Sequence, residues 1–122
     1  MPTTQTSKQD GLLTVELLDE GERVRLALLG ELDLSNAATA ETQLEEALGR
    51  ELPVLVDMSK LEFLDSTGIA MLVIAMKRSD ASRLTFVPSE SIAVRRVLQM
   101  TGLDDRLPLA PGGEADQLLP SA

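Results

Sequence analysis

Residues 65–68 read Asp-Ser-Thr-Gly and bring a carboxylate, two hydroxyls and a glycine into one short segment. The apolar run 54–58 upstream is typical of a buried strand, and the apolar run 69–76 downstream is long enough for a helix. The segment is therefore predicted to be a strand-to-helix turn, in which Gly68 lets the backbone turn tightly. A helix N-terminus presents unpaired N–H groups and positive partial charge, so a phosphate added to a hydroxyl can be held there without a metal.

The same residues also have a simpler interpretation, in which Asp65 or Ser66 only caps the helix. On four residues alone the cap is the better explanation, because short motifs match by chance in many proteins. Asp33 presents the same choice. It follows a strand end, at the edge where ligand sites of open α/β folds gather, but it also suits an ordinary helix entry. Asp57 ranks below Asp33, because strand alternation can equally point it at solvent.

Three separated segments resemble the STAS family, the domain of anti-sigma factor antagonists and of sulphate-transporter tails. Residues 30–33 (Gly-Glu-Leu-Asp) are similar to the family's strand-end motif, and residues 63–68 to its Asp-Ser-Ser/Thr-Gly turn. Residues 94–103 are similar to its last helix and the glycine that stops it. The three segments stand in the family's order within residues 12–109, which is far more specific than any one motif.

The resemblance implies a stand-alone anti-sigma factor antagonist. In such proteins the serine directly after the aspartate is phosphorylated, which corresponds to Ser66 rather than Thr67. The surroundings of this phosphosite are then Asp33, Asp65, Thr67 and Gly68. The implied partners are an anti-sigma factor serine kinase, bound by the unphosphorylated protein, and a phosphatase that acts on Ser66.

The predicted helix after Ser66 carries a second feature, because residues 69–76 are apolar all the way round. A helix on a sheet needs only one apolar stripe, so one explanation is deep burial between the sheet and neighbouring helices. The other is an exposed face beside Ser66, formed by Ile69, Met71 and Ile74, that binds the partner. The resemblance supports the exposed face, since antagonists bind their kinase with this helix. A phosphate at its edge adds close to two negative charges and opposes docking.

Composition restricts the function further. Eleven basic and twenty acidic side chains give a net charge of −9, and such a field repels nucleic acid and anionic membrane surfaces. The absence of cysteine and histidine removes thiol chemistry, the commonest general base and the commonest zinc ligand, so we expect no catalysis, metal or cofactor. Residues 1–10 lack the apolar core of a signal peptide, and run 69–76 is far below the ~20 residues that span a bilayer. A soluble, cytoplasmic protein is expected.

The remaining segments alternate between strands and helices. Apolar segments 12–18 and 23–29, joined by an acidic turn with a glycine, predict a hairpin. Helices are predicted after caps at Ser35 and Ser89. The first buries Ala37, Ala40, Leu44, Ala47 and Leu48, and the second buries Ile92, Ala93, Val97 and Met100. Further strands are predicted at 54–58, at 84–87 and, as a short last strand, at 107–110.

This order predicts an α/β fold of the STAS type: a mixed, mostly parallel sheet of four to five strands with three to four helices packed on it. Residues 1–10 are expected to form a flexible tail, residues 11–110 the domain, and residues 111–122 a weakly structured segment.

Two other functions compete with the antagonist. Small STAS proteins also partner the ATPases of transporters, so the alternative is an accessory subunit of a lipid ABC transporter. A nucleotide-binding module is the least favoured, because the chain has no G-x-x-x-x-G-K loop.

Overall fold

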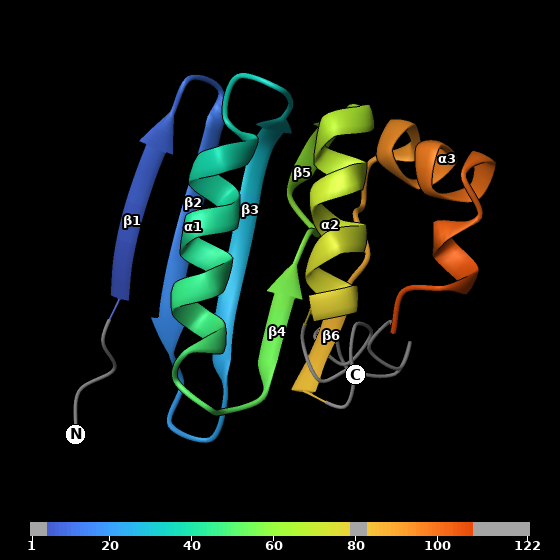
Figure 1. Ribbon diagram of the computed structural model, residues 1–122. Coiled ribbons are helices and arrows are strands. Elements are labelled where there is room, and N and C mark those ends of the chain that lie inside the picture. Colours follow the sequence, from blue (N-terminus) through green and yellow to red (C-terminus); the bar gives the residue numbers. More distant parts are fainter. Residues whose placement is uncertain (1–4, 79–82, 109–122) are drawn as a thin grey trace, which may run out of the picture.

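The computed structural model describes residues 5–78 and 83–108. A six-stranded sheet carries helices α1 (Ala37–Leu48) and α2 (Ser66–Arg78) on one face (Figure 1). The strand order is β1-β2-β3-β4-β6, with β5 paired to β3 outside this path. None of the described helices is both long enough and apolar enough to cross a membrane.

Alternating apolar and polar residues form the central hairpin. Strands β2 (Leu13–Asp19) and β3 (Val24–Leu32) bury every second side chain over most of their length, as expected for strands with one face on a core. They pair antiparallel, so the predicted hairpin is confirmed.

The prediction of a flexible tail over residues 1–10 is wrong for the last six of them. They form β1 (Gln5–Asp10), which pairs antiparallel with β2. Its side chains are exposed except for the half-buried Asp10, so backbone hydrogen bonds rather than apolar burial hold the strand. Thr39 Oγ1 also donates to the Asp10 carboxylate at 2.7 Å and links the strand to α1. Residues 1–4 lie outside the described residues.

The other half of the sheet is parallel. Strand β4 (Val54–Asp57) pairs with β3 and with β6 (Leu84–Val87), and β5 (Leu61–Leu64) pairs with the end of β3. With three parallel and two antiparallel pairings, the sheet is mixed and only slightly more parallel than antiparallel. The expected α/β fold is correct, although the sheet has six strands instead of four to five.

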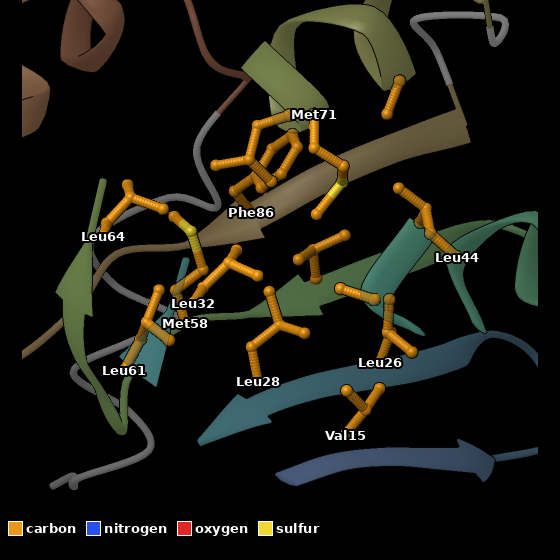
Figure 2. Close-up of a cluster of buried hydrophobic side chains, with 14 of the residues drawn as sticks. Val15, Leu26, Leu28, Leu32, Leu44, Met58, Leu61, Leu64, Met71 and Phe86 are labelled. Carbon is orange, nitrogen blue, oxygen red and sulfur yellow. The ribbon is translucent and has the colours of Figure 1, made fainter. Parts of the chain in front are cut away.

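The core lies between the sheet and helices α1 and α2. Figure 2 shows Leu26 and Leu28 of β3 facing Leu44 of α1 and Met71 of α2, with Phe86 of β6 beside them. The predicted apolar face of α1 is confirmed, because four of its five members are buried and Leu48 is half-buried.

The beginning of α1 differs from the prediction. Ser35 does not cap the helix; its hydroxyl donates to Asp33 Oδ1 at 2.6 Å. Asn36 occupies the cap position, and its side-chain oxygen accepts from Asp33 N at 2.9 Å. Its amide nitrogen donates to Glu31 O at 3.0 Å. The buried Asn36 therefore binds the backbone of the connection in place of the first turn of the helix.

Helix α3 (Ile92–Met100) buries a different face from the one predicted. Val94 and Leu98 are buried, whereas Ile92 and Met100 are 64% and 79% exposed. The buried face differs because α3 does not lie on the face of the sheet that carries α1 and α2. It contacts β5 and the 3-10 helix η2 (Leu103–Asp105) instead (Figure 1).

The predicted cap of α3 is also wrong. Ser91 Oγ accepts from Val94 N, although at a long 3.5 Å. Ser89 is buried, and its hydroxyl donates to Leu61 O at 2.6 Å, which fixes the connection against β5.

The predicted last strand at 107–110 is not formed in its described part, residues 107 and 108. Pro108 O nevertheless accepts from Phe86 N at 3.0 Å, beside β6. Residues 109 and 110, and the segment 111–122, lie outside the described residues.

Candidate functional site

Two parallel strands end side by side and deliver the residues of the site to one edge of the sheet. Leu32, the last residue of β3, is the register partner of Leu64, the last residue of β5. Asp33 and Asp65 follow these two residues directly, and Ser66 opens α2. The structure therefore brings together the two acids and the serine that the sequence singled out.

Asp65 caps α2 and also binds the connection before α1. Its Oδ1 accepts from Gly68 N at 3.0 Å, which satisfies an otherwise unpaired N–H of the first turn. Its Oδ2 accepts from Leu34 N at 3.1 Å, across the gap between two connections. The capping interpretation is therefore correct for Asp65. Because Asp65 supplies the cap, Ser66 is not needed for it.

Ser66 is the first residue of α2, and its side chain is exposed, whereas Thr67 is half-buried. The hydroxyl of Ser66 therefore lies at the positive end of the helix dipole and within reach of an enzyme. A phosphate there would lie close to the N–H groups of the first turn.

The two segments that meet at the edge carrying Ser66 are rich in acidic residues. The two segments at this edge, residues 30–36 and 61–67, contain four carboxylates and no lysine or arginine. The carboxylates belong to Glu31, Asp33, Glu62 and Asp65. A phosphate on Ser66 would find no cation within these two segments.

Gly68 acts differently from the prediction, because it lies inside the first turn of α2 and does not need a positive φ. A Cβ at this position would lie 2.6 Å from Leu64 Cδ1 and 2.9 Å from Leu32 Cγ. The glycine therefore lets the helix approach the paired strand ends closely, and this contact sets the height of Ser66 above the sheet.

Asp33 forms a local turn at the entry to α1. Its Oδ1 accepts from both Ser35 N, at 2.9 Å, and Ser35 Oγ. These contacts agree with an ordinary helix entry, while its place one residue beyond β3 puts it at the same edge as Ser66.

The predicted docking face on α2 is only partly exposed. Met71 is 7% exposed and belongs to the core (Figure 2), so its prediction as a surface residue is wrong. Ile69 is half-buried against the core, whereas Ile74 is 46% exposed. Four-residue spacing places Ser66, Ala70 and Ile74 along one exposed line of the helix.

A groove of about 270 Å³ lies between α1 and α2, next to Ile74. Its floor is apolar and includes Leu44 and Met71. Arg78 crosses its mouth, with Nη1 at 3.1 Å from Glu45 Oε2 and 3.5 Å from Glu41 Oε2. The exposed line of α2 therefore runs from Ser66 to this groove.

Asp57 does not join the site. Its Oδ2 is 2.7 Å from Arg25 Nη1, and its Oδ1 accepts from Ser59 N at 2.9 Å. One carboxylate oxygen therefore links β4 to β3, and the other binds the backbone that directly follows β4.

Two leucines that the sequence analysis did not single out lie at the same edge. Leu34, between Asp33 and Ser35, is 75% exposed, and Leu12, in the turn between β1 and β2, is 68% exposed. Single leucines in loops have no periodicity that could reveal them. The available signal is a large apolar residue inside an otherwise polar connection.

Within residues 5–78 and 83–108, no three acidic, histidine or cysteine side chains are grouped so that they could hold a metal ion. The site offers instead an exposed hydroxyl on a helix N-terminus, at an edge of the sheet that also carries carboxylates and exposed leucines. Such an arrangement can accept a phosphoryl group and can contact another protein.

The chain belongs to the STAS domain family: the family model described as "Mlab, STAS domain" matches residues 16–111. A curated relative is the anti-sigma-F factor antagonist RsfB of Mycobacterium tuberculosis (strain CDC 1551 / Oshkosh), 31% identical over 93 residues. The match covers 75% of this chain and 76% of that protein.

Solved structures share the fold. An anti-sigma factor antagonist from Mycobacterium paratuberculosis superposes with a TM-score of 0.70 at 24% identity, covering 88% of this chain and 86% of that one. The unphosphorylated form of the anti-sigma factor antagonist SpoIIAA gives a TM-score of 0.66 at 25% identity, covering 83% and 91%. The phosphorylated form of the Bacillus cell fate determinant SpoIIAA gives 0.57 at 24% identity, covering 83% and 95%.

Proposed function

We propose that this protein is an anti-sigma factor antagonist that binds a serine-kinase anti-sigma factor while Ser66 is unphosphorylated. Phosphorylation of Ser66 by that kinase switches binding off, and a phosphatase that removes the phosphate restores it. The observation that carries the proposal is the exposed Ser66 hydroxyl at the start of α2, in a turn whose cap is supplied by Asp65. The relatives named above, which are antagonists, support it.

The chemistry requires no catalytic group from this chain. Ser66 Oγ attacks the γ-phosphorus of ATP held by the kinase, and the bond from that phosphorus to the bridging oxygen breaks, releasing ADP. The serine proton passes to a base of the kinase. This chain supplies an acceptor in fixed position, because Gly68 rests on the strand ends and Asp65 closes the first turn.

The product opposes the complex for an electrostatic reason. Phosphoserine adds about −1.5 to −2 charge beside Asp33 and Asp65, and residues 30–36 and 61–67 offer no cation to neutralise it. We assign the contact with the kinase to the exposed line of α2, together with Ile74 and the half-buried Ile69. The buried Met71 packs in the core beneath α2 and supports this surface without contacting the kinase.

The alternative, an accessory subunit of a lipid ABC transporter ATPase, is not favoured by these relatives. The proposed role is carried out in the cytoplasm, where sigma factors act. Identification of the protein captured from the source cell by the unphosphorylated chain separates the two functions, since one predicts a serine kinase and the other a transporter ATPase.

The phosphosite is tested by mass spectrometry after incubation with the captured kinase and ATP. Trypsin releases residues 61–77 as one peptide, in which Ser66 and Thr67 are the only hydroxyl side chains. Fragmentation should place the phosphate on Ser66, and Ser66→Ala should leave the peptide unmodified. Phosphate confined to Thr67, or none with a kinase that is active on another substrate, contradicts the proposal.

A further inference from the structure

The edge of the sheet that carries Ser66 also carries two exposed leucines. Leu34 lies in the connection between β3 and α1, and Leu12 lies in the turn between β1 and β2. They are 75% and 68% exposed. Figure 1 shows that both connections and the first turn of α2 lie at the same end of the sheet. A single exposed leucine is common at a protein surface, but exposed apolar side chains that share an edge with polar residues are a feature of interaction sites.

Hydrogen bonds hold both leucines in place. Leu34 N donates to Asp65 Oδ2 at 3.1 Å, and the same carboxylate caps the helix that Ser66 opens. Leu12 O accepts from Glu31 N at 3.0 Å, which fixes the β1–β2 turn against the end of β3. One carboxylate therefore sets the backbone of Leu34 relative to the phosphoacceptor, and the leucine is preorganised for a contact.

Charge indicates what kind of surface fits this edge. Glu31, Asp33 and Glu62 belong to the two segments at this edge, residues 30–36 and 61–67, which contain no basic side chain. Lys60, directly before the second segment, pairs with Glu90 at 3.3 Å. An apolar contact with an acidic rim is complementary to a partner that presents apolar side chains flanked by basic ones. Because an enzyme that phosphorylates Ser66 must close around this hydroxyl, it also covers the neighbouring edge.

We propose that Leu34, with Leu12 at the same end of the sheet, is an apolar anchor for the kinase that acts on Ser66, and that Asp65 is a positioning residue that holds this anchor in register with the phosphoacceptor. The inference rests on the proposed function. It adds the β3–α1 connection to the contact surface and names the chemistry of the partner surface, apolar at its centre and basic at its rim.

The test compares Leu34→Ser with Met100→Ser in the full chain. Met100 is 79% exposed at the far end of α3, which contacts β5 and η2, so its substitution removes an equally exposed apolar side chain elsewhere. Leu34→Ser should raise the Kd for the kinase and the KM for Ser66 phosphorylation about tenfold, the loss typical of an anchor residue. Its kcat should stay within about twofold, as should every constant of Met100→Ser, and Leu34→Met should restore binding.

Asp65 is tested by Asp65→Asn, whose side chain keeps one acceptor oxygen for two N–H donors. Misalignment of anchor and acceptor should lower kcat about tenfold in a protein that melts near the wild-type temperature. A kcat equal to that of the wild type overturns the positioning role.

Two outcomes separate the inference from the proposed function. If the wild type binds the kinase and is phosphorylated while Leu34→Ser behaves identically, the anchor is wrong and the function stands. If the wild type neither binds the kinase nor accepts phosphate, the proposed function itself fails.

Discussion

At position 68 the absence of a side chain decides how closely α2 can rest on the sheet. Replacement of Gly68 by alanine would place a Cβ 2.6 Å from Leu64 Cδ1 and 2.9 Å from Leu32 Cγ. Overpacking of this kind costs ~1–3 kcal/mol, and the better helix propensity of alanine offsets up to about 1 kcal/mol. We expect Gly68→Ala to lower the free energy of unfolding by about 1–2 kcal/mol, measured by denaturant titration.

Gly49 supplies the matched control. It ends α1 with φ −68° and ψ −11°, which alanine adopts freely, and its added Cβ would meet only the carbonyls of Glu45 and Glu46, each at 3.5 Å. Gly49→Ala should therefore stabilise the protein by about 0.4–1 kcal/mol. Equal effects of the two substitutions would show that close packing at Gly68 is not what constrains this turn.

Two substitutions of Ser66 separate the effect of losing the hydroxyl from the effect of adding negative charge. Ser66→Ala should bind the kinase like the wild type and remain bound in the presence of ATP, because it cannot accept phosphate. Ser66→Asp should bind about tenfold more weakly, since a single carboxylate falls short of the −1.5 to −2 charge of phosphoserine. Calorimetric titration of the kinase measures both.

Thermal melts serve as the folding control for these variants. A negative side chain at a helix N-terminus is neutral to favourable, so Ser66→Asp should melt like the wild type. If it does and binds with unchanged affinity, and authentic phosphorylation also leaves affinity unchanged, the switch lies elsewhere.

Residue types predicted part of the site. The aspartate, the serine and the helix after them could be predicted, because capping chemistry and an apolar run are local properties. The buried position of Met71 and the packing role of Gly68 depend on which strands lie beneath α2, and no local pattern contains that information. Leu34 was missed for the same reason, since only the bond of its N–H to Asp65 shows what the exposed leucine adjoins.

At the scale of elements, periodicity predicted the parts that bury one face. The β2–β3 hairpin and α1 follow their apolar patterns. Strand β1 is polar and exposed, and β5 buries only its first and last residues, so neither shows alternation. Both are held by strand pairing, which is a long-range property. The buried face of α3 was misassigned because it packs against β5 and η2.

The ion pairs of the hairpin give a prediction for pH. Arg25 on β3 contacts Glu20 Oε2 at 3.1 Å and Asp57 Oδ2 at 2.7 Å, and Arg23 contacts Glu20 Oε1 at 2.7 Å. Burial alone would raise the pKa of Glu20, but hydrogen bonds and charge from Arg23 and Arg25 outweigh it and lower that pKa. The pKa of Arg25 is raised, because the two carboxylates outweigh its desolvation.

A lowered pKa in the folded state means that the unfolded chain binds more protons at acid pH. The stabilisation from Glu20 is therefore present above the ordinary glutamate pKa of about 4.3 and is lost as pH falls through the folded value. At pH 7, Glu20→Gln should lower the free energy of unfolding by about 1 kcal/mol or less. The difference from the wild type should shrink between about pH 5 and pH 3.

The control for this prediction is Glu22→Gln, an exposed glutamate in the same turn. Denaturant titrations of the three proteins across this pH range measure the effect. A gap between the wild type and Glu20→Gln that stays constant with pH would show that the ion pairs do not couple stability to protonation.

At the scale of the whole molecule, the hydrophobic core and the candidate site lie in different parts of the fold. The face of the sheet under α1 and α2 is filled by the core, while the connections that leave the strands gather Asp33, Leu34, Asp65 and Ser66 at one edge. A net charge of −9 opposes the binding of nucleic acid by electrostatic repulsion.

The composition of the whole chain limits its chemistry, because a chain without histidine or cysteine lacks the commonest general base and a common nucleophile. Of the acids at the site, Asp33 accepts through Oδ1 from Ser35 N and Ser35 Oγ, and Asp65 accepts from Gly68 N and Leu34 N. The purified protein should therefore release no phosphate from ATP or GTP above the buffer rate, whereas adding the kinase should transfer phosphate from ATP to Ser66. A malachite-green assay on the protein alone, with Asp33→Ala as the comparison, tests this directly. Hydrolysis that follows the protein through purification and disappears in Asp33→Ala would show that this chain is itself an enzyme and not only a substrate and binding partner.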